Sequence, residues 1–388
     1  MPRFADLTLQ IIAAMAIAMA LSLVFTPLVK RFAERVGAID IPQDNRRVHK
    51  VPIPRLGGLA IFVGFVLSVV IFAEIDREIQ GILLGSIIIV TVGVLDDIFH
   101  LRAWQKLLAQ MLAAGVAVWH GITITFLSNP FATATSPYLA MGTLVYIPLT
   151  MIWIVGITNA VNLIDGLDGL AVGVSTIASL FMLIVALFVT GDANVAVVLA
   201  ALAGACIGFM PYNLNPAKIF MGDTGALLLG FLLSTISIVG LFKFYAAISF
   251  AVPFLVLALP IFDTAFAFFR RVAHGKSPME ADRGHLHHRL LDRGFSQKQV
   301  VFIIYIISSV LGLIAVIMSS SGEVRALFAL AAFLLIIITA FIAFSGNLLR
   351  PRKRKQVAET EDEIGLPAED IPEGEPVEDE AEGENAQG

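Results

Sequence analysis

The stretch LTLQIIAAMAIAMALSLVFTPLV, residues 7–29, carries no charge and is long enough to cross a lipid bilayer as one helix. It lacks the small-residue cleavage site of a signal peptide and is too long for a signal peptide's apolar region, so we expect it to remain as a span. Ten further apolar stretches follow, near residues 56–73, 81–95, 105–126, 144–160, 171–190, 195–212, 225–241, 247–269, 300–318 and 326–345. The sequence therefore predicts an all-α, polytopic membrane helix bundle of about eleven transmembrane helices.

The composition points the same way. Hydrophobic residues make up 57% of the 388 residues and charged residues only 15%, whereas soluble domains contain about 25% charged residues. This argues against a soluble enzyme. The single cysteine, Cys206, excludes a disulfide framework and a zinc site built from cysteines.

The basic residues are unevenly divided between the two sides that eleven spans define. One set of alternate connections, counted with Lys106 beside it, holds 22 of the 26 Lys and Arg residues. Positively charged loops stay in the cytoplasm, so this set is predicted to be cytoplasmic. The N-terminus then faces outward and the C-terminus is cytoplasmic.

The C-terminal segment differs from the rest of the chain. It begins with the basic run RPRKRK, and residues 356–388 then hold 13 acidic residues and no Lys or Arg. Such a segment cannot bury enough apolar surface to fold. We predict a transmembrane catalytic domain over 1–349 and a disordered cytoplasmic tail over 350–388, with a docking site for a basic partner as the alternative. Without those acids the body has 26 basic and 18 acidic residues, a net charge of +8, against -5 for the whole chain.

Two acidic motifs lie on the predicted cytoplasmic side. GVLDDIF places Asp96 and Asp97 at the end of the third span, and FMGDTG places Asp223 at the start of the eighth. Adjacent carboxylates repel unless a cation or a shared proton relieves them, and paired acids commonly hold Mg²⁺. The alternatives are a solvated carboxylate at the membrane interface and, for Asp223, a helix cap.

Two further motifs lie on the same side. NLIDGLDG carries Asn162, Asp165 and Asp168 at spacings of three, near one helical face, although Asp168 could instead cap the sixth span. HGKSPMEADRGHLHHRLL follows Asp263 and combines a histidine trio with arginines. Imidazoles and guanidiniums suit phosphate oxygens better than a zinc ion; anionic lipid headgroups are the alternative ligand.

Together these motifs offer carboxylates for Mg²⁺ and cations for phosphates on one face, without a Walker-type loop. That chemistry suits transfer of a phosphoryl-linked group at the membrane surface. The competing class is an ion-coupled transporter, whose intramembrane acids belong near the middle of the bilayer. Here the acids cluster at one face.

Five strings occur in order along the chain: RRVHKVPIPRLGGLAI, GVLDDIF, NAVNLIDGLDGLA, FMGDTGALLLG and HGKSPMEADRGHLHHRLL. Over about residues 5–345 they resemble the polyprenyl-phosphate N-acetylhexosamine-1-phosphate transferase family. VHKVPIPRLGG and RGHLHHRL are similar to the undecaprenyl-phosphate N-acetylglucosamine-1-phosphate transferases, which start O-antigen, enterobacterial common antigen or teichoic-acid linkage synthesis. The alternative is the muramyl-pentapeptide branch of peptidoglycan synthesis. That branch typically has threonine-methionine-glycine-glycine in place of PRLGG, and often a lysine in place of His100.

The resemblance implies that undecaprenyl phosphate attacks the sugar-linked phosphate of UDP-N-acetylglucosamine and releases UMP. It implies Mg²⁺ as the cofactor, with Mn²⁺ as a substitute, and a site on the cytoplasmic face of the bacterial cytoplasmic (inner) membrane. The partners it implies are the two substrates and the lipid bilayer, with no nucleic acid; a homodimer is left open.

The resemblance also assigns roles by motif. Asp96 and Asp97 would be catalytic, Asp96 by deprotonating or orienting the lipid phosphate and Asp97 by assisting at the metal. Asp223 would be the principal Mg²⁺ ligand, with Asn162. The residues expected to bind substrate are Asp165, Asp168, Phe220, Lys106, Arg283, His285, His287 and His288.

Overall fold

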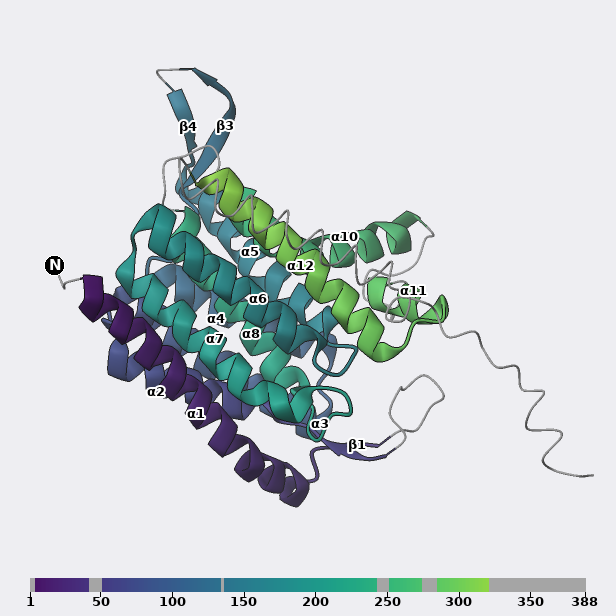
Figure 1. The fold of residues 1–388 in the computed structure, drawn as a ribbon. Coiled ribbons are helices and arrows are strands. Elements are labelled where there is room, and N and C mark those ends of the chain that lie inside the picture. The colour runs from purple at the N-terminus through teal and green to yellow at the C-terminus, as the bar shows by residue number, and fades with distance from the viewer. Residues whose placement is uncertain (1–3, 42–50, 134–135, 243–250, 274–284, 321–388) are drawn as a thin grey trace, which may run out of the picture. The chain divides into compact units, whose positions relative to one another are not determined.

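The computed structural model describes residues 4–41, 51–133, 136–242, 251–273 and 285–320, which are mainly helical (Figure 1). The helices are α1 (Phe4–Val36), α2 (Gly58–Phe72), α3 (Arg77–Phe99), α4 (Ala103–Trp119), α5 (Thr143–Ile164), α6 (Leu170–Val185), α7 (Ala193–Asn213), α8 (Gly222–Ser237), α9 (Ala251–Val256), α10 (Ala258–Ala273), α11 (Leu286–Asp292) and α12 (Gln297–Ser319). Two π-helical turns, η1 (Ala186–Thr190) and η2 (Ile238–Phe242), continue α6 and α8.

Seven of the described helices are long and apolar enough to cross a membrane: α1, α3, α5, α6 with η1, α7, α8 and α12. The shorter helix α2 is also apolar. Ten of the eleven predicted stretches coincide with helix, and the eleventh, 326–345, lies outside the described residues, as does the tail from 350. A multi-pass helical bundle is therefore confirmed, whereas eleven spans, the sides of the termini and the domain boundary stay predictions.

Two predicted spans differ from the observed helices. The stretch 105–126 is shorter as a helix, because α4 ends at Trp119 and the chain turns through Gly121 at a positive φ of 96°. The described part of the stretch 247–269, from residue 251 on, is divided into α9 and α10, with Leu257 between them. Pro260 then lies in the first turn of α10, where its missing N–H removes no helical hydrogen bond.

The all-α class is confirmed, and two short antiparallel strand pairs accompany the helices. β1 (Ile39–Asp40) pairs with β2 (Ile53–Pro54), with Ile39 opposite Pro54. β3 (Phe126–Thr133) pairs with β4 (Ser136–Ala140) in a segment predicted to be a loop. β1 and β2 are too short to show the alternation by which a strand is recognised in sequence.

Helix α8 lies at the centre of the bundle, with α2, α3, α5 and α6 packed against it. Its sequence, GDTGALLLGFLLSTIS, is apolar around nearly its whole circumference after the first turn, as a fully enclosed helix requires. Helix α1 lies along α7 at one side (Figure 1). The central position of α8 brings its N-terminal residues, including Asp223, close to several other helices.

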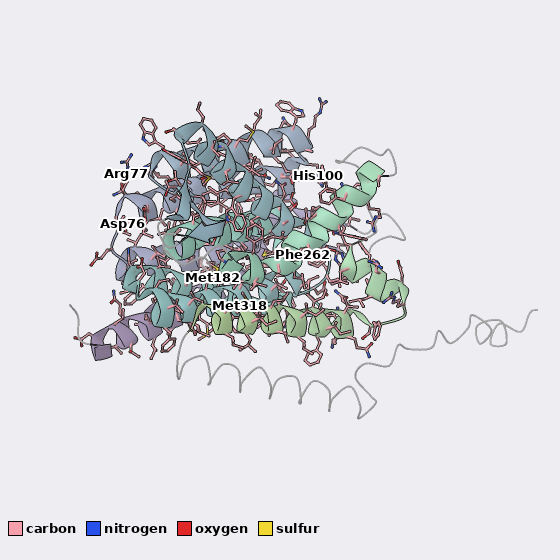
Figure 2. The ribbon with its side chains drawn as sticks, turned by 90° about the horizontal axis from the view of Figure 1, so that it is seen from above. Asp76, Arg77, His100, Met182, Phe262 and Met318 are labelled. Carbon is pink, nitrogen blue, oxygen red and sulfur yellow. The ribbon has the colours of Figure 1, made fainter. Side chains whose placement is uncertain are left out.

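The position of α3 shows at which end of the bundle its polar residues lie. Figure 2 labels Arg77 and His100, which stand at the two ends of α3 on opposite sides of that view. Asp96 and Asp97 belong to the last turn, at the His100 end. The site is therefore built at this end, where α3 and α5 finish and α8 begins.

The start of α8 is held close to α3 by Gly93, because a Cβ built on Gly93 would overlap the Thr224 backbone. We expect Gly93→Ala to lower the free energy of unfolding by about 1–3 kcal/mol, since one of the two helices must move. Gly115→Ala is the matched control, because a Cβ on Gly115 meets nothing within 4 Å. Thermal unfolding of both purified variants tests this, and equal midpoints would contradict the close contact.

Candidate active site

A lysine joins carboxylates from two helices at the centre of the site. Lys106 Nζ, from the first turn of α4, lies 3.0 Å from Asp96 Oδ2 and 2.6 Å from Asp223 Oδ2. Asn162 Nδ2, near the end of α5, donates to Asp223 Oδ1 over 3.1 Å. Four predicted site residues from four helices are thus in direct contact, and the two acids share one cation.

The turn after α3 gives Lys106 its position. His100 ends α3 in the left-handed conformation, with a φ of 55°, and its N–H donates to the Asp96 carbonyl. The next N–H, of Leu101, donates to Asp96 Oδ1 over 2.7 Å. Because of this tight turn, α4 starts beside the last turn of α3. Lys106, ten residues after Asp96, therefore lies next to the Asp96 carboxylate.

Asp97 faces the N-terminus of α8. Its Oδ1 accepts from the Asp223 N–H over 3.0 Å, and its Oδ2 accepts from the Thr224 N–H over 3.0 Å and from Thr224 Oγ1 over 2.6 Å. A helix N-terminus has N–H groups without intrahelical partners, and carboxylate oxygens satisfy them. Asp97 therefore caps α8 from another helix and holds the backbone of Asp223, whereas a cap by Asp223 itself had been the alternative.

A cavity of about 490 Å³ opens beside these residues. It is lined by six of the predicted site residues: Asn162, Asp165, Asp168, Phe220, Asp223 and His288. The lining does not include Asp96, Asp97, Lys106, His285 or His287, and Arg283 lies outside the described residues. The cavity is large enough for a nucleotide-sized ligand, since small-molecule sites begin near 300 Å³.

Asp168 organises the loop between α7 and α8. Its Oδ2 accepts from Asn215 Nδ2 over 2.9 Å and from the Ala217 N–H over 3.0 Å. Asn213 ties the same loop to the end of the NLIDGLDG motif, because its Oδ1 accepts from the Gly169 N–H and its Nδ2 donates to the Ile219 carbonyl. The motif thus shapes one wall of the cavity.

Asp165 lies half-buried in the cavity wall. Desolvation, followed by the nearby negative charges of Asp223 and Asp97, raises the pKa of its carboxyl to about 8. A carboxyl that keeps its proton near neutral pH can donate a hydrogen bond as well as accept one. Asp165 can therefore meet an acceptor on a ligand, such as a carbonyl oxygen of a pyrimidine base.

The histidines form a packed group on α11 and the residue before it. His285 Nδ1 lies 2.8 Å from Asp263 Oδ2, and Asp263 Oδ1 accepts from the Leu286 N–H over 2.7 Å. His287 is buried against Gly166, and burial, followed by the neighbouring charge of His288, lowers the pKa of His287 to about 4. A neutral His287 supports the wall, while His288 reaches the cavity.

Arg55 and Asp40 line the cavity but were not among the predicted site residues. They form an ion pair of 2.8 Å between Arg55 Nη2 and Asp40 Oδ1. In the sequence, Arg55 is one of five basic residues of its loop, with Arg46, Arg47, His49 and Lys50, and a loop predicted to be cytoplasmic is expected to be basic. The pairing of β1 with β2 brings the two residues together, and strands of two residues leave no pattern in the sequence by which this pairing could be predicted.

With this geometry in view, comparison with known proteins identifies the family. Residues 79–241 match the family described as glycosyl transferase family 4. A probable undecaprenyl-phosphate N-acetylglucosaminyl 1-phosphate transferase of Bacillus subtilis (strain 168) is 41% identical over 348 residues, covering 89% of this chain and 94% of the relative. The chain belongs to glycosyl transferase family 4. The resemblance read from the five motifs, to the polyprenyl-phosphate N-acetylhexosamine-1-phosphate transferases, is confirmed.

Two further relatives differ in the activity that their names state. An undecaprenyl-phosphate alpha-N-acetylglucosaminyl 1-phosphate transferase of Thermotoga maritima is 34% identical over 268 residues, covering 69% of this chain and 78% of the relative. A phospho-N-acetylmuramoyl-pentapeptide-transferase of Clostridioides difficile (strain 630) is 29% identical over 330 residues, covering 80% and 97%. The match at 41% identity thus belongs to a glucosaminyl transferase, in line with the PRLGG and His100 departures from the muramyl branch.

Proposed function

We propose that the protein transfers N-acetylglucosamine 1-phosphate from UDP-N-acetylglucosamine to undecaprenyl phosphate. An oxygen of the lipid phosphate forms a bond to the sugar-linked phosphorus, the bond from that phosphorus to the bridging oxygen breaks, and UMP leaves. The observation that carries the proposal is the pair of carboxylates sharing Lys106 beside a nucleotide-sized cavity, in a chain of this family. The names of the 41% and 34% identical relatives support the same sugar and lipid.

The donor set suits Mg²⁺ as the cofactor, with Mn²⁺ as a substitute. Asp96 and Asp223 already bind one cation between them, the Lys106 ammonium. No three His, Cys, Asp or Glu side chains converge on a metal-sized space among the residues described. Mg²⁺ commonly takes one or two carboxylates and completes its shell with water and substrate phosphates, so Asp223, with the Asn162 amide beside it, can hold it. When bound, the ion neutralises charge on the diphosphate.

We favour direct attack by the lipid phosphate over a covalent intermediate on Asp96 or Asp97. A phosphate monoester has a second pKa near 6 and is largely a dianion at neutral pH, so it needs positioning more than a base. Lys106 can release one carboxylate and bind a phosphate oxygen of the lipid instead, and Asp96 then orients the Lys106 ammonium. Asp97 acts on the reaction by holding the Asp223 backbone.

The remaining parts of the proposal concern the membrane. We assign the chain to the bacterial cytoplasmic membrane with eleven spans and a cytoplasmic site, because the basic loops of the sequence lie on the side where the acidic motifs lie. Both substrates are anionic, and a basic face attracts them. The product would enter cell-envelope polysaccharide synthesis. The muramyl-pentapeptide reaction is the alternative within the family. An ion-coupled transporter is not favoured, because the chain belongs to a family of transferases.

We expect the purified protein with Mg²⁺ to release UMP from UDP-N-acetylglucosamine only when a polyprenyl phosphate is supplied. UDP-muramyl-pentapeptide in the same assay separates the two branches, and we expect it to release at most about one hundredth as much UMP, a discrimination within the reach of a binding pocket. Removing the metal with a chelator should stop release, and adding Mg²⁺ or Mn²⁺ should restore it. UMP release without a lipid acceptor would contradict the proposed reaction.

A further inference from the structure

We propose that Arg55 binds the diphosphate of the nucleotide sugar, and that Asp40 holds its guanidinium at the cavity wall for that purpose. The inference rests on the proposed function, because it names the residue that would recognise the charged part of the donor substrate.

The charges around the cavity require a cation there. Four carboxyl groups line it, those of Asp40, Asp165, Asp168 and Asp223, and among the described residues of the lining Arg55 is the one Lys or Arg. Asp165 keeps its proton near neutral pH, so the carboxylates of Asp40, Asp168 and Asp223 are the groups that would repel a diphosphate. The positive charge of Arg55 is also the influence on Asp165 that favours its ionised form. A guanidinium therefore stands where a phosphate group needs a partner.

The ion pair with Asp40 leaves the guanidinium able to bind a second anion. Arg55 Nη2 lies 2.8 Å from Asp40 Oδ1, and the Arg55 side chain remains 25% exposed while that of Asp40 is 9% exposed. A guanidinium has five N–H donors in a planar fork, so one edge can bind a carboxylate while another meets phosphate oxygens. Asp40 thus acts as a positioning residue.

The backbone around Arg55 is also constrained. The Arg55 N–H donates to the Ala38 carbonyl over 2.9 Å, which continues the β1–β2 pairing. The next residue, Leu56, is fully buried and has a φ of 77°. A bulky residue in the left-handed region is strained and persists only where the surrounding structure imposes it. The strain lies directly beside the arginine.

The same segment is bonded to the loop that carries Asp223. The Phe220 N–H donates to the Pro54 carbonyl over 2.8 Å, and the Gly57 N–H donates to the Phe220 carbonyl over 2.9 Å. Arg55 lies between these two hydrogen bonds in sequence, so its position is tied to the residues just before Asp223. A ligand that reaches from Arg55 to Asp223 would thus bridge two walls built as one unit.

The competing explanation is that the Arg55–Asp40 pair only joins β1 to β2. Both explanations predict some loss of stability when Arg55 is changed, so stability cannot decide between them. They differ in what the change does to ligands with and without phosphates. A structural pair would affect uridine and UDP equally, whereas a diphosphate-binding arginine affects UDP alone.

The test is calorimetric titration of the full-length protein with UDP and with uridine in the presence of Mg²⁺. We expect Arg55→Gln to weaken UDP binding about 10- to 100-fold, as for a lost charge-assisted hydrogen bond, and to leave uridine binding unchanged. Arg55→Lys should recover part of the loss, because the charge remains and the fork is lost. Lys218→Gln is the matched control, since Lys218 lies exposed in the α7–α8 loop outside the cavity lining.

Turnover provides a second readout. In Arg55→Gln the KM for UDP-N-acetylglucosamine should rise while the KM for the polyprenyl phosphate stays constant. An unchanged UDP-to-uridine affinity ratio in both Arg55 variants overturns the assignment while leaving the transferase proposal standing. A wild-type protein that neither binds UDP nor releases UMP overturns both. If Arg55→Gln does not fold, the ratio measured in Arg55→Lys decides.

Discussion

Replacing Asp223 with asparagine is expected to reduce UMP release by about 1,000-fold, the range seen when a preorganised electrostatic group is removed from an active site. Asp223 Oδ2 is the closer partner of Lys106, at 2.6 Å, and its Oδ1 accepts from Asn162. Asp223 also lines the cavity, unlike Asp96. The substitution removes the negative charge that would hold Mg²⁺ and leaves Lys106 with Asp96 as its single carboxylate partner. Both cations that would bind substrate phosphates, Mg²⁺ and the Lys106 ammonium, then lose their positions.

The control for this variant is Asp192→Asn, which makes the same chemical change at the N-terminus of another helix. Asp192 Oδ1 accepts from the Val195 N–H over 3.0 Å at the start of α7, and Asp192 is not among the cavity residues. We expect it to retain nearly full activity. Initial rates of UMP release, with the unfolding midpoint of each variant recorded, separate lost chemistry from lost fold. An Asp223→Asn enzyme with more than half of the wild-type rate would remove Asp223 from the mechanism.

The sequence was sufficient to find the polar face of the bundle. Apolar stretches identify helices because a bilayer imposes their length, and ten of the eleven stretches coincide with helix. Asp96, Asn162 and Asp223 come from three separate motifs and Lys106 from none of them, and the structure brings all four into contact. The reason is topological: polar residues at helix ends on one side of a membrane can gather only there.

What the sequence could not supply is the division of roles between neighbouring residues. Asp96 and Asp97 are adjacent, yet one binds Lys106 and the other caps α8, and the capping contacts join residues 126 and 127 positions apart. Arg55 was missed for the same reason, because its partner Asp40 is brought to it by two-residue strands without a pattern of their own. Such contacts depend on how helices and strands pack against one another, and the periodicity of the sequence within one element does not predict them.

Asp97→Asn is expected to lose about 100-fold in activity and also 1–3 kcal/mol of stability, a combination that a residue acting only on substrate would not give. The three donors that face Asp97, the N–H groups of Asp223 and Thr224 and the Thr224 hydroxyl, need acceptors on both carboxylate oxygens. An amide replaces one oxygen with an NH₂ group, which turns a donor toward a donor. The first turn of α8 must then shift, and it carries Asp223 with it.

Asp96→Asn provides the contrast, because Asp96 accepts from the Leu101 N–H and from Lys106 Nζ beside the start of α4, whereas the N–H groups at the start of α8 donate to Asp97. We expect it to lose activity with a smaller change in the unfolding midpoint than Asp97→Asn. The two variants are compared by UMP release and by thermal unfolding in the same detergent. Equal stability of the two, with equal loss of activity, would mean that Asp97 acts on the substrate or the metal directly, as the family resemblance implies, and that its contacts with α8 are secondary.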